Sequence, residues 1–389
     1  MTVAPLIIPG DHSRTLAHGI AEALNSRVVD VMTKRFDDNE VKTRIEENIR
    51  GRDVVVVASA AGHPDEQEKE TRLLLRAAVK RCDAKSVTLL VPYMWYGRSD
   101  DNWGERNEPA LMDTIETLRP LCDKVVVADP HNALMVREKF AEAAKTNVVH
   151  FAYPYAVQLR AMIEAGIITR ESLLLSHADS GSTKRISPTF RACVYSTLQL
   201  EGRKAEQDDW AVGLKDRDKV TGKSYYKGFD TQVKGRDVVI FEDMIASGGT
   251  AMELADMLKG HGARSVILFA TSGLFTTKPG QAPDASVKRL DASKTLDAVF
   301  ITDTYDHAPV TPSLQAAIDA SPLIHTVKTA PYLASIIRAL YADAVPERME
   351  DNSISSILNG SHKLNGTIAS VTPYKPGSPL LRLKGLAAA

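Results

Sequence analysis

The chain contains few cysteines, no long hydrophobic run and no excess of positive charge. Its three cysteines, Cys82, Cys122 and Cys193, have a spacing that fits neither a metal site nor a redox pair. We therefore expect core or near-core thiols of a reducing compartment. No apolar run approaches the roughly 18 residues of a membrane-spanning helix, and the first residues lack the charged and apolar regions of a signal peptide. These absences predict a cytoplasmic protein that does not bind a membrane.

The charge balance excludes further classes of partner. A formal net charge of -1 gives no support to binding of nucleic acid or of an anionic membrane. The 389 residues are 44% hydrophobic and 25% charged, which are ordinary values for a soluble globular protein. This length predicts two or three domains, each able to form its own core.

Two segments of the chain are repeated in the same order. Arg50–Val57 resembles Lys234–Phe241, and further along Ala84–Leu90 resembles Ala263–Phe269. Turn–strand units recur in any α/β protein, but two matched units in the same order favour a duplicated domain.

Apolar strand patterns alternate with helical patterns in both halves, which predicts parallel sheets covered on both faces by helices. We expect strands at Val28–Met32, Asp53–Ser59, Ser86–Val91, Lys124–Ala128, Leu173–Ser176, Asp237–Phe241, Ser265–Ala270 and Ala298–Thr302. We expect helices at Thr15–Leu24, Glu66–Arg81, Met112–Leu118, Ala156–Glu164, Thr250–His261 and Ala330–Tyr341. Ligands of such folds bind beyond the C-terminal ends of the strands.

The pattern divides the chain into three parts: residues 1–150, residues 151–345, and a C-terminal segment with a proline-rich extended tail at 346–389. Two stretches of the second part, Gln199–Thr231 and Thr276–Lys294, are predicted to be loops or insertions because they are rich in charge or turn-forming residues.

The most informative motif is Val238–Thr250. A buried strand pattern ends in Glu242 and Asp243, and the small residues Ala246–Gly249 precede a helical pattern. Backbone amides of such a loop and the following helix N-terminus favour a phosphate, and glycines allow close approach. Acids at this place can hydrogen-bond ribose hydroxyls. The motif therefore predicts a site for a phosphorylated sugar.

In this context the chain resembles the ribose-phosphate diphosphokinase (phosphoribosyl-diphosphate, or PRPP, synthetase) family from about residue 5 to about residue 360. The segments that carry the resemblance, in chain order, are Phe36–Glu40, Asn48–Gly51, Val91–Arg98, Ala128–His131, Glu242–Thr250, Thr302–Thr304 and Ser353–Leu358. The resemblance implies two duplicated phosphoribosyltransferase-like (Rossmann-like) α/β domains. It also implies that ribose 5-phosphate and ATP give PRPP and AMP with the help of Mg²⁺, and that the enzyme is a homo-oligomer, a dimer or a hexamer, with phosphate and ADP acting at a subunit interface.

The resemblance assigns roles to individual residues. Phe36, Asp38 and Glu40 would hold adenine, from a neighbouring subunit, and Arg98 and Asp100 would belong to the ATP site. Ribose phosphate would bind Glu242, Asp243, Ser247, Gly248, Gly249 and Thr250.

Four further residues are implied in metal binding or catalysis. His131 and Asp179 would serve Mg²⁺, and Lys215 and Arg217 together with His131 would act on the transferring phosphates. From the residues alone, His131 also fits a hydrogen-bonded structural group, Asp179 an Asx-turn, and Lys215 and Arg217 a solvated charged loop.

The chain departs from the family pattern at two of these motifs. Ala246 stands where the family loop has an aspartate, and Arg98–Asn102 lacks the second arginine of the family's ATP-binding run. Two alternatives therefore stay open: a diphosphokinase with another ribose-5-phosphate derivative, such as ADP-ribose, as acceptor, and a non-catalytic regulatory homologue. AMP formation with each acceptor separates the three hypotheses.

Overall fold

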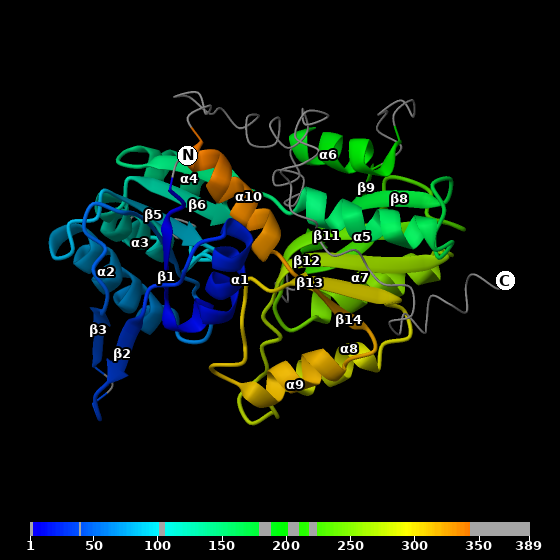
Figure 1. The fold of residues 1–389 in the computed structure, drawn as a ribbon. Helices are drawn as coiled ribbons and strands as arrows, with labels where there is room; N and C mark the ends of the chain where they lie inside the picture. Colours follow the sequence, from blue (N-terminus) through cyan, green and yellow to red (C-terminus); the bar gives the residue numbers. More distant parts are fainter. Residues whose placement is uncertain are drawn as a thin grey trace. The chain divides into compact units, whose positions relative to one another are not determined.

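The computed structural model describes residues 3–38, 40–100, 106–178, 188–200, 210–217 and 224–342. Their packing divides them into two units, both visible in Figure 1. The first unit holds residues 3–151 together with Thr304–Val310 and the described residues from Thr329 onward. The second holds Ala152–Asp303 and Thr311–Lys328. The predicted segment at 346–389 lies outside the described residues.

The first unit is built on a parallel sheet with the strand order β1-β4-β5-β6-β7. These strands are β1 (Leu6–Pro9), β4 (Asp53–Val57), β5 (Ser86–Val91), β6 (Lys124–Ala128) and β7 (Lys145–Val149). The helices of this unit are η1 (Asp11–Ser13), α1 (Arg14–Leu24), α2 (Pro64–Lys80), α3 (Ala110–Leu118), η2 (Arg119–Leu121), α4 (Ala133–Ala141) and α10 (Ala330–Tyr341). Val54–Val57 are fully buried, because a parallel sheet is covered on both faces.

A separate antiparallel hairpin, β2 (Val31–Arg35) and β3 (Val41–Ile45), completes the first unit. It does not belong to the five-stranded sheet, and it is the blue pair beside α2 in Figure 1. The sequence prediction placed a strand at Val28–Met32, but the strand begins at Val31, and Val28 forms only an isolated bridge with Ile7.

The second unit has a seven-stranded sheet with the order β10-β9-β8-β11-β12-β13-β14, in which only β10 runs antiparallel to its neighbour. Its strands are β8 (Leu173–His177), β9 (Trp210–Arg217), β10 (Ser224–Phe229), β11 (Asp237–Ile245), β12 (Ser265–Gly273), β13 (Ala298–Thr302) and β14 (Ile324–Val327). Its helices are α5 (Ala152–Glu164), α6 (Pro188–Leu198), α7 (Gly249–Gly260), α8 (Ala285–Asp291) and α9 (Pro312–Ala320).

Aromatic rings tie the central strands of this sheet together. Phe241, Phe269 and Phe300 occupy paired positions on β11, β12 and β13. The ring centroids of Phe269 and Phe300 are 4.5 Å apart, and those of Phe241 and Phe269 are 5.7 Å apart. Large buried rings in register contribute packing beyond their area.

The repeated segments form the same local structure in both units. Gly51 and Gly235 adopt left-handed φ angles of 66° and 74° at the turn before β4 and β11. The first residue of each strand then accepts from the serine that starts the neighbouring strand: Ser86 Oγ lies 2.6 Å from Asp53, and Ser265 Oγ lies 2.6 Å from Asp237. The repeated sequence thus encodes a glycine turn and an aspartate that is hydrogen-bonded to the first residue of the neighbouring strand. This link between the starts of two strands is here called the aspartate clasp.

The α/β architecture with parallel sheets confirms the predicted fold class, and several predicted elements match closely. The loop prediction was wrong for two segments: Gln199–Thr231 includes the strands β9 and β10, and Thr276–Lys294 includes α8. The strand predicted at Asp237–Phe241 continues to Ile245, because β12 extends beside it.

The second half of the chain also supplies parts of the first unit. Arg338 of α10 donates to the carbonyl of Ala23 at 2.7 Å, and Ser59 Oγ donates to the carbonyl of Thr304 at 3.1 Å. The sequence grouped these segments with 151–345, since nothing in a local pattern shows which core a helix joins. The domain limits stay a prediction.

Candidate functional site

The phosphate motif of the second unit lies at the C-terminal end of β11. Glu242 and Asp243 belong to the strand itself, where Asp243 is buried and Glu242 is half-buried. The loop after Ile245 leads into α7, whose N-cap is Gly248. The acids therefore stand one short loop away from a helix N-terminus, as the sequence predicted.

Gly248 is required by both its backbone and its surroundings. Its φ is 78°, a left-handed value that side chains disfavour. A Cβ at this position would lie 3.0 Å from Leu290 Cδ2. The loop is also held by backbone bonds, such as Thr276 N to the carbonyl of Ala246 at 2.9 Å. The loop is thus fixed before any ligand arrives.

The loop presents polar groups outward. Ser247 and Thr250 are exposed, and the first N–H groups of α7 have no partner within the helix ladder. Arg289 of α8 donates to the carbonyl of Ser247 and brings a positive charge to the loop. The sequence prediction missed Arg289, because it lies in the segment read as an insertion. Amides, hydroxyls and a nearby cation are the groups that hold a phosphate.

In the first unit, the segment after β5 meets the segment after β6. A Cβ on Gly97 would lie 3.8 Å from the Cβ of His131, so the two backbones approach closely. Asn132 Nδ2 donates to Asp100 at 2.9 Å, while its Oδ1 caps α4 by accepting from Met135 N at 3.0 Å. The structure therefore places the segment that holds Asp100 against the segment that holds His131 at the C-terminal strand ends.

Two residues beside these loops have left-handed backbones that are unusual for their type. Tyr96 has a φ of 50° and Asp129 a φ of 42°. His150 Nδ1 lies 2.6 Å from Asp129 Oδ1 and holds this carboxylate. Such conformations cost roughly 1–3 kcal/mol each and gather at functional sites. Arg98, next to this strained turn, and His131 are both exposed.

The predicted adenine-binding residues lie at the tip of the β2–β3 hairpin. Phe36 is 44% exposed, and Lys34 Nζ lies 5.3 Å from the centre of its ring. Phe36 N donates to the carbonyl of Glu40 at 2.9 Å, and Glu40 N donates to Asp38 Oδ1 at 3.1 Å. The tip thus offers an exposed aromatic ring and the exposed carboxylates of Asp38 and Glu40.

Three predicted residues are described less fully or not at all. Lys215 and Arg217 belong to β9, where they pair with Tyr226 and Ser224 of β10, so they lie in a strand rather than in the predicted loop. Asp179 lies outside the described residues.

A protein site for Mg²⁺ needs several oxygen ligands. The part of the chain that the structure describes contains no cluster of three or more His, Cys, Asp or Glu side chains able to hold a metal ion. A Mg²⁺ ion that arrives with a nucleotide does not need such a cluster, because phosphate oxygens and waters supply most of its ligands. The described residues are therefore compatible with nucleotide-borne Mg²⁺.

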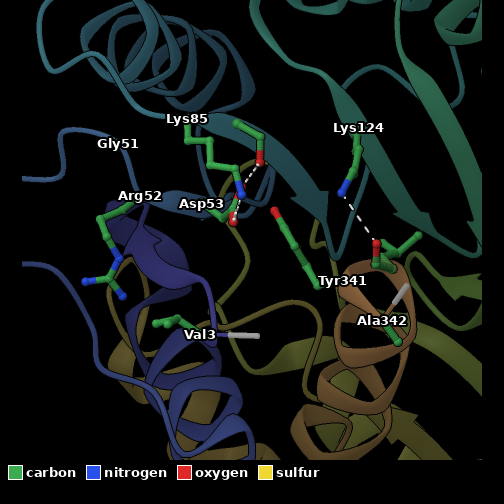
Figure 2. Close-up of a pocket in the computed structure, with 10 residues that line it drawn as sticks. Val3, Gly51, Arg52, Asp53, Lys85, Lys124, Tyr341 and Ala342 are labelled. Carbon is green, nitrogen blue, oxygen red and sulfur yellow. Dashed lines mark hydrogen bonds and ion pairs between the residues drawn. The ribbon is translucent and has the colours of Figure 1, made fainter. Parts of the chain in front are cut away.

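A pocket of about 600 Å³ lies at the opposite edge of the first sheet, where β4, β5 and β6 begin (Figure 2). Lys124 Nζ lies 3.4 Å from the carbonyl of Leu340 and 4.0 Å from the ring centre of Tyr341. Burial lowers the pKa of Lys124. The pKa of Asp53 falls, because burial, which raises it, is outweighed by bonds from Ser86 and Lys85 and by nearby lysines. This pocket is distinct from the strand ends described above.

Comparisons with known proteins identify the relatives of this chain. Residues 6–117 match the family model for the N-terminal domain of ribose phosphate pyrophosphokinase. The ribose-phosphate pyrophosphokinase of Shewanella oneidensis is 25% identical over 355 residues, which cover 91% of this chain and 98% of the relative. That of Brucella melitensis is 26% identical over 356 residues and covers 91% and 99%. A crystal structure of phosphoribosylpyrophosphate synthetase from Mycobacterium smegmatis has a TM-score of 0.69 at 22% identity, covers 87% of this chain and 99% of that one, and shows the fold.

Proposed function

We propose that this chain, which belongs to the ribose-phosphate pyrophosphokinase family, transfers the β,γ-diphosphate of ATP to the anomeric hydroxyl of ribose 5-phosphate. The observation that carries the proposal is similarity along both halves of the chain to relatives of that name, each covered almost from end to end. A shared phosphate loop alone would not require the duplicated architecture.

The reaction forms one bond and breaks another. The anomeric oxygen bonds to the β-phosphorus of ATP, and the bond from that phosphorus to the α,β-bridging oxygen breaks. That oxygen leaves as part of AMP, and the hydroxyl proton passes to water. Little covalent chemistry falls to the protein, so alignment and neutralisation of charge carry most of the catalysis. Mg²⁺ bound with ATP would offset the negative charge of the phosphates, and His131 and Asp179 are the residues proposed to hold it.

The second unit supplies the groups proposed for the sugar phosphate. The amides at the start of α7, with Ser247 and Thr250, would hold the 5-phosphate, and Arg289 adds positive charge at the same loop. Glu242 and Asp243 would accept from ribose hydroxyls. The fixed left-handed turn at Gly248 means that these donors need little rearrangement on binding.

The first unit supplies the groups proposed for ATP. Phe36 would stack on adenine, and Asp38 and Glu40 would accept from the exocyclic amine. Arg98 and His131 follow neighbouring strands, where they would face phosphates and the nucleotide-bound Mg²⁺ together with Asp179.

Two basic residues of β9, in the second unit, are proposed to act on the transferring phosphates. Lys215 would act as a point charge and Arg217 as a forked donor.

The test incubates the protein with Mg-ATP and either ribose 5-phosphate or ADP-ribose and measures the AMP formed by chromatography. We expect AMP with ribose 5-phosphate. AMP with ADP-ribose alone would support the alternative acceptor, and no AMP with either would support the regulatory homologue. Neither alternative is favoured by the relatives' names. Ala246 is the residue that motivates the acceptor test, since an aspartate is replaced there.

Three finer properties stay predictions: a homo-oligomer, a cytoplasmic location, and the absence of nucleic-acid and membrane partners. Within the described ranges, no helix is long and apolar enough to cross a membrane. Sedimentation of the purified chain with and without Mg-ATP and phosphate measures the oligomer directly.

A further inference from the structure

The β2–β3 hairpin has no sheet neighbour to fix its direction. It forms a two-stranded sheet of its own, with Thr33 paired to Thr43 near its middle. A two-stranded hairpin is marginally stable by itself in water. Its tip carries Phe36, Asp38 and Glu40, so the direction of the tip depends on contacts between the hairpin and the rest of the first unit.

Helix α2 supplies two of these contacts through glutamates on successive turns, beside the hydrogen bond from Arg14 Nη2 of α1 to the carbonyl of Val31. Glu70 is 1% exposed, and its Oε1 accepts from Thr33 Oγ1 at 3.0 Å and from Asp11 N at 3.1 Å. One oxygen atom therefore joins the hairpin to the segment after β1. Four residues earlier, Glu66 pairs with Arg35 at 3.0 Å, but these side chains are 36% and 28% exposed. Of these two ties between α2 and the hairpin, the hydrogen bond to Glu70 is the more buried, so water competes with it least.

We propose that Glu70 is a positioning residue that acts through Thr33 to set the direction of the β2–β3 hairpin and thereby of the nucleotide-binding tip. This proposal rests on the proposed function, because it takes the tip to bind ATP. Thr33 lies on β2 before Phe36, so Glu70 acts on the tip through the strand and not by direct contact with a proposed adenine-binding residue.

The hydrogen bonds of Glu70 Oε1 allow conservative variants to be told from disruptive ones. Both donors use a single oxygen, so an uncharged carboxamide at position 70 keeps an acceptor in the same place. Glu70→Gln should therefore retain the tie, whereas Glu70→Ala removes it. On the hairpin, Thr33→Val keeps the shape and strand preference of the side chain but has no hydroxyl, and Thr33→Ser keeps the hydroxyl.

The kinetic experiment measures kcat and the KM values for ATP and ribose 5-phosphate in these four variants. Loss of one largely buried hydrogen bond corresponds to roughly a tenfold change in an equilibrium constant. We expect Thr33→Val and Glu70→Ala to raise the KM for ATP about tenfold, with kcat and the KM for ribose 5-phosphate changed less than about threefold. Thr33→Ser and Glu70→Gln should stay within about threefold of the wild type in all three. The proposal would be overturned if Thr33→Val left the KM for ATP unchanged. It would also be overturned if kcat and both KM values worsened by the same factor.

A second measurement needs no turnover. Hydrogen exchange of the full chain should show faster exchange of the β2–β3 amides in Thr33→Val and not in Thr33→Ser, and equilibrium dialysis should show weaker ATP binding in the same variant. If the wild type forms no AMP but these two effects appear, the proposed function fails and the positioning role stands. If exchange and ATP binding match the wild type, the positioning role fails whatever the activity.

Discussion

The two aspartate clasps offer a direct test of how burial sets the strength of an interaction. Asp53 and Asp237 start equivalent strands and accept from equivalent serines, yet their side chains are 20% and 1% exposed. The perturbation is the same isosteric change, Asp→Asn, made separately at each position. It removes the negative charge and places an amide donor among the neighbouring donors.

The expected magnitudes differ because the surroundings differ. Asp237 binds Arg264 through both oxygens, with Nε at 2.8 Å, and also accepts from Ser172 and Ser265. Removing one member of a buried pair costs about 3–5 kcal/mol, and we take about 3 because Arg264 is 31% exposed and can reach water. Asp53 loses a pair with Lys85, which is 67% exposed, and a bond from Ser86, together about 1–2 kcal/mol.

The assay is hydrogen exchange with mass spectrometry on the intact protein, because peptides from β4 and β11 report on the two units separately. We expect the opening free energy of the β11 region to fall by about 3 kcal/mol in Asp237→Asn, and that of the β4 region to fall by no more than about 2 kcal/mol in Asp53→Asn. Double variants with Arg264→Leu and Lys85→Leu serve as controls for the ion pairs. Equal losses at the two positions, or a loss at Asp237 below that at Asp53, would refute the reasoning.

Three further predictions concern the site and the pH dependence. Gly248→Ala should raise the KM for ribose 5-phosphate at least tenfold, since a left-handed alanine costs about 1–2 kcal/mol and its Cβ would press on Leu290; an unchanged KM would show that the turn is not used. Lys215→Ala should lower kcat by a hundredfold or more with little change in ATP binding, because its charge is proposed to act on the transition state, whereas the exposed Lys80→Ala should be neutral; equal kcat in both variants would remove Lys215 from the mechanism. Burial raises the pKa of Glu70 from 4.5 to about 7, although the hydrogen bond from Thr33 lowers it. The folded state therefore binds a proton at this carboxyl more tightly than the unfolded state does. The resulting contribution to stability is complete below pH 4.5 and is lost as the pH rises through 7. In urea unfolding, the wild type should therefore lose up to about 3 kcal/mol relative to Glu70→Gln between pH 4.5 and 8, and parallel pH profiles would contradict this.

Local patterns in the sequence determined the central elements of both units. Ser86–Val91, Lys124–Ala128 and Ala298–Thr302 have the predicted bounds, because strands buried on both faces need runs of mostly apolar residues. The Ser247–Thr250 loop was also predictable, since its glycines and the following helical period specify the backbone locally.

Tertiary structure alone decided which segments meet. Helix α10 was predicted with its observed bounds, but its place in the first unit depends on contacts such as that of Arg338 with the carbonyl of Ala23, more than 300 residues away. The pairing of β9 with β8 and β10, the approach of Arg289 to Ser247, and the burial of Glu70 against Thr33 were likewise not predictable. The physical reason is that periodicity reports which face of an element is buried, whereas the partner of that face is chosen by packing among segments distant in the chain.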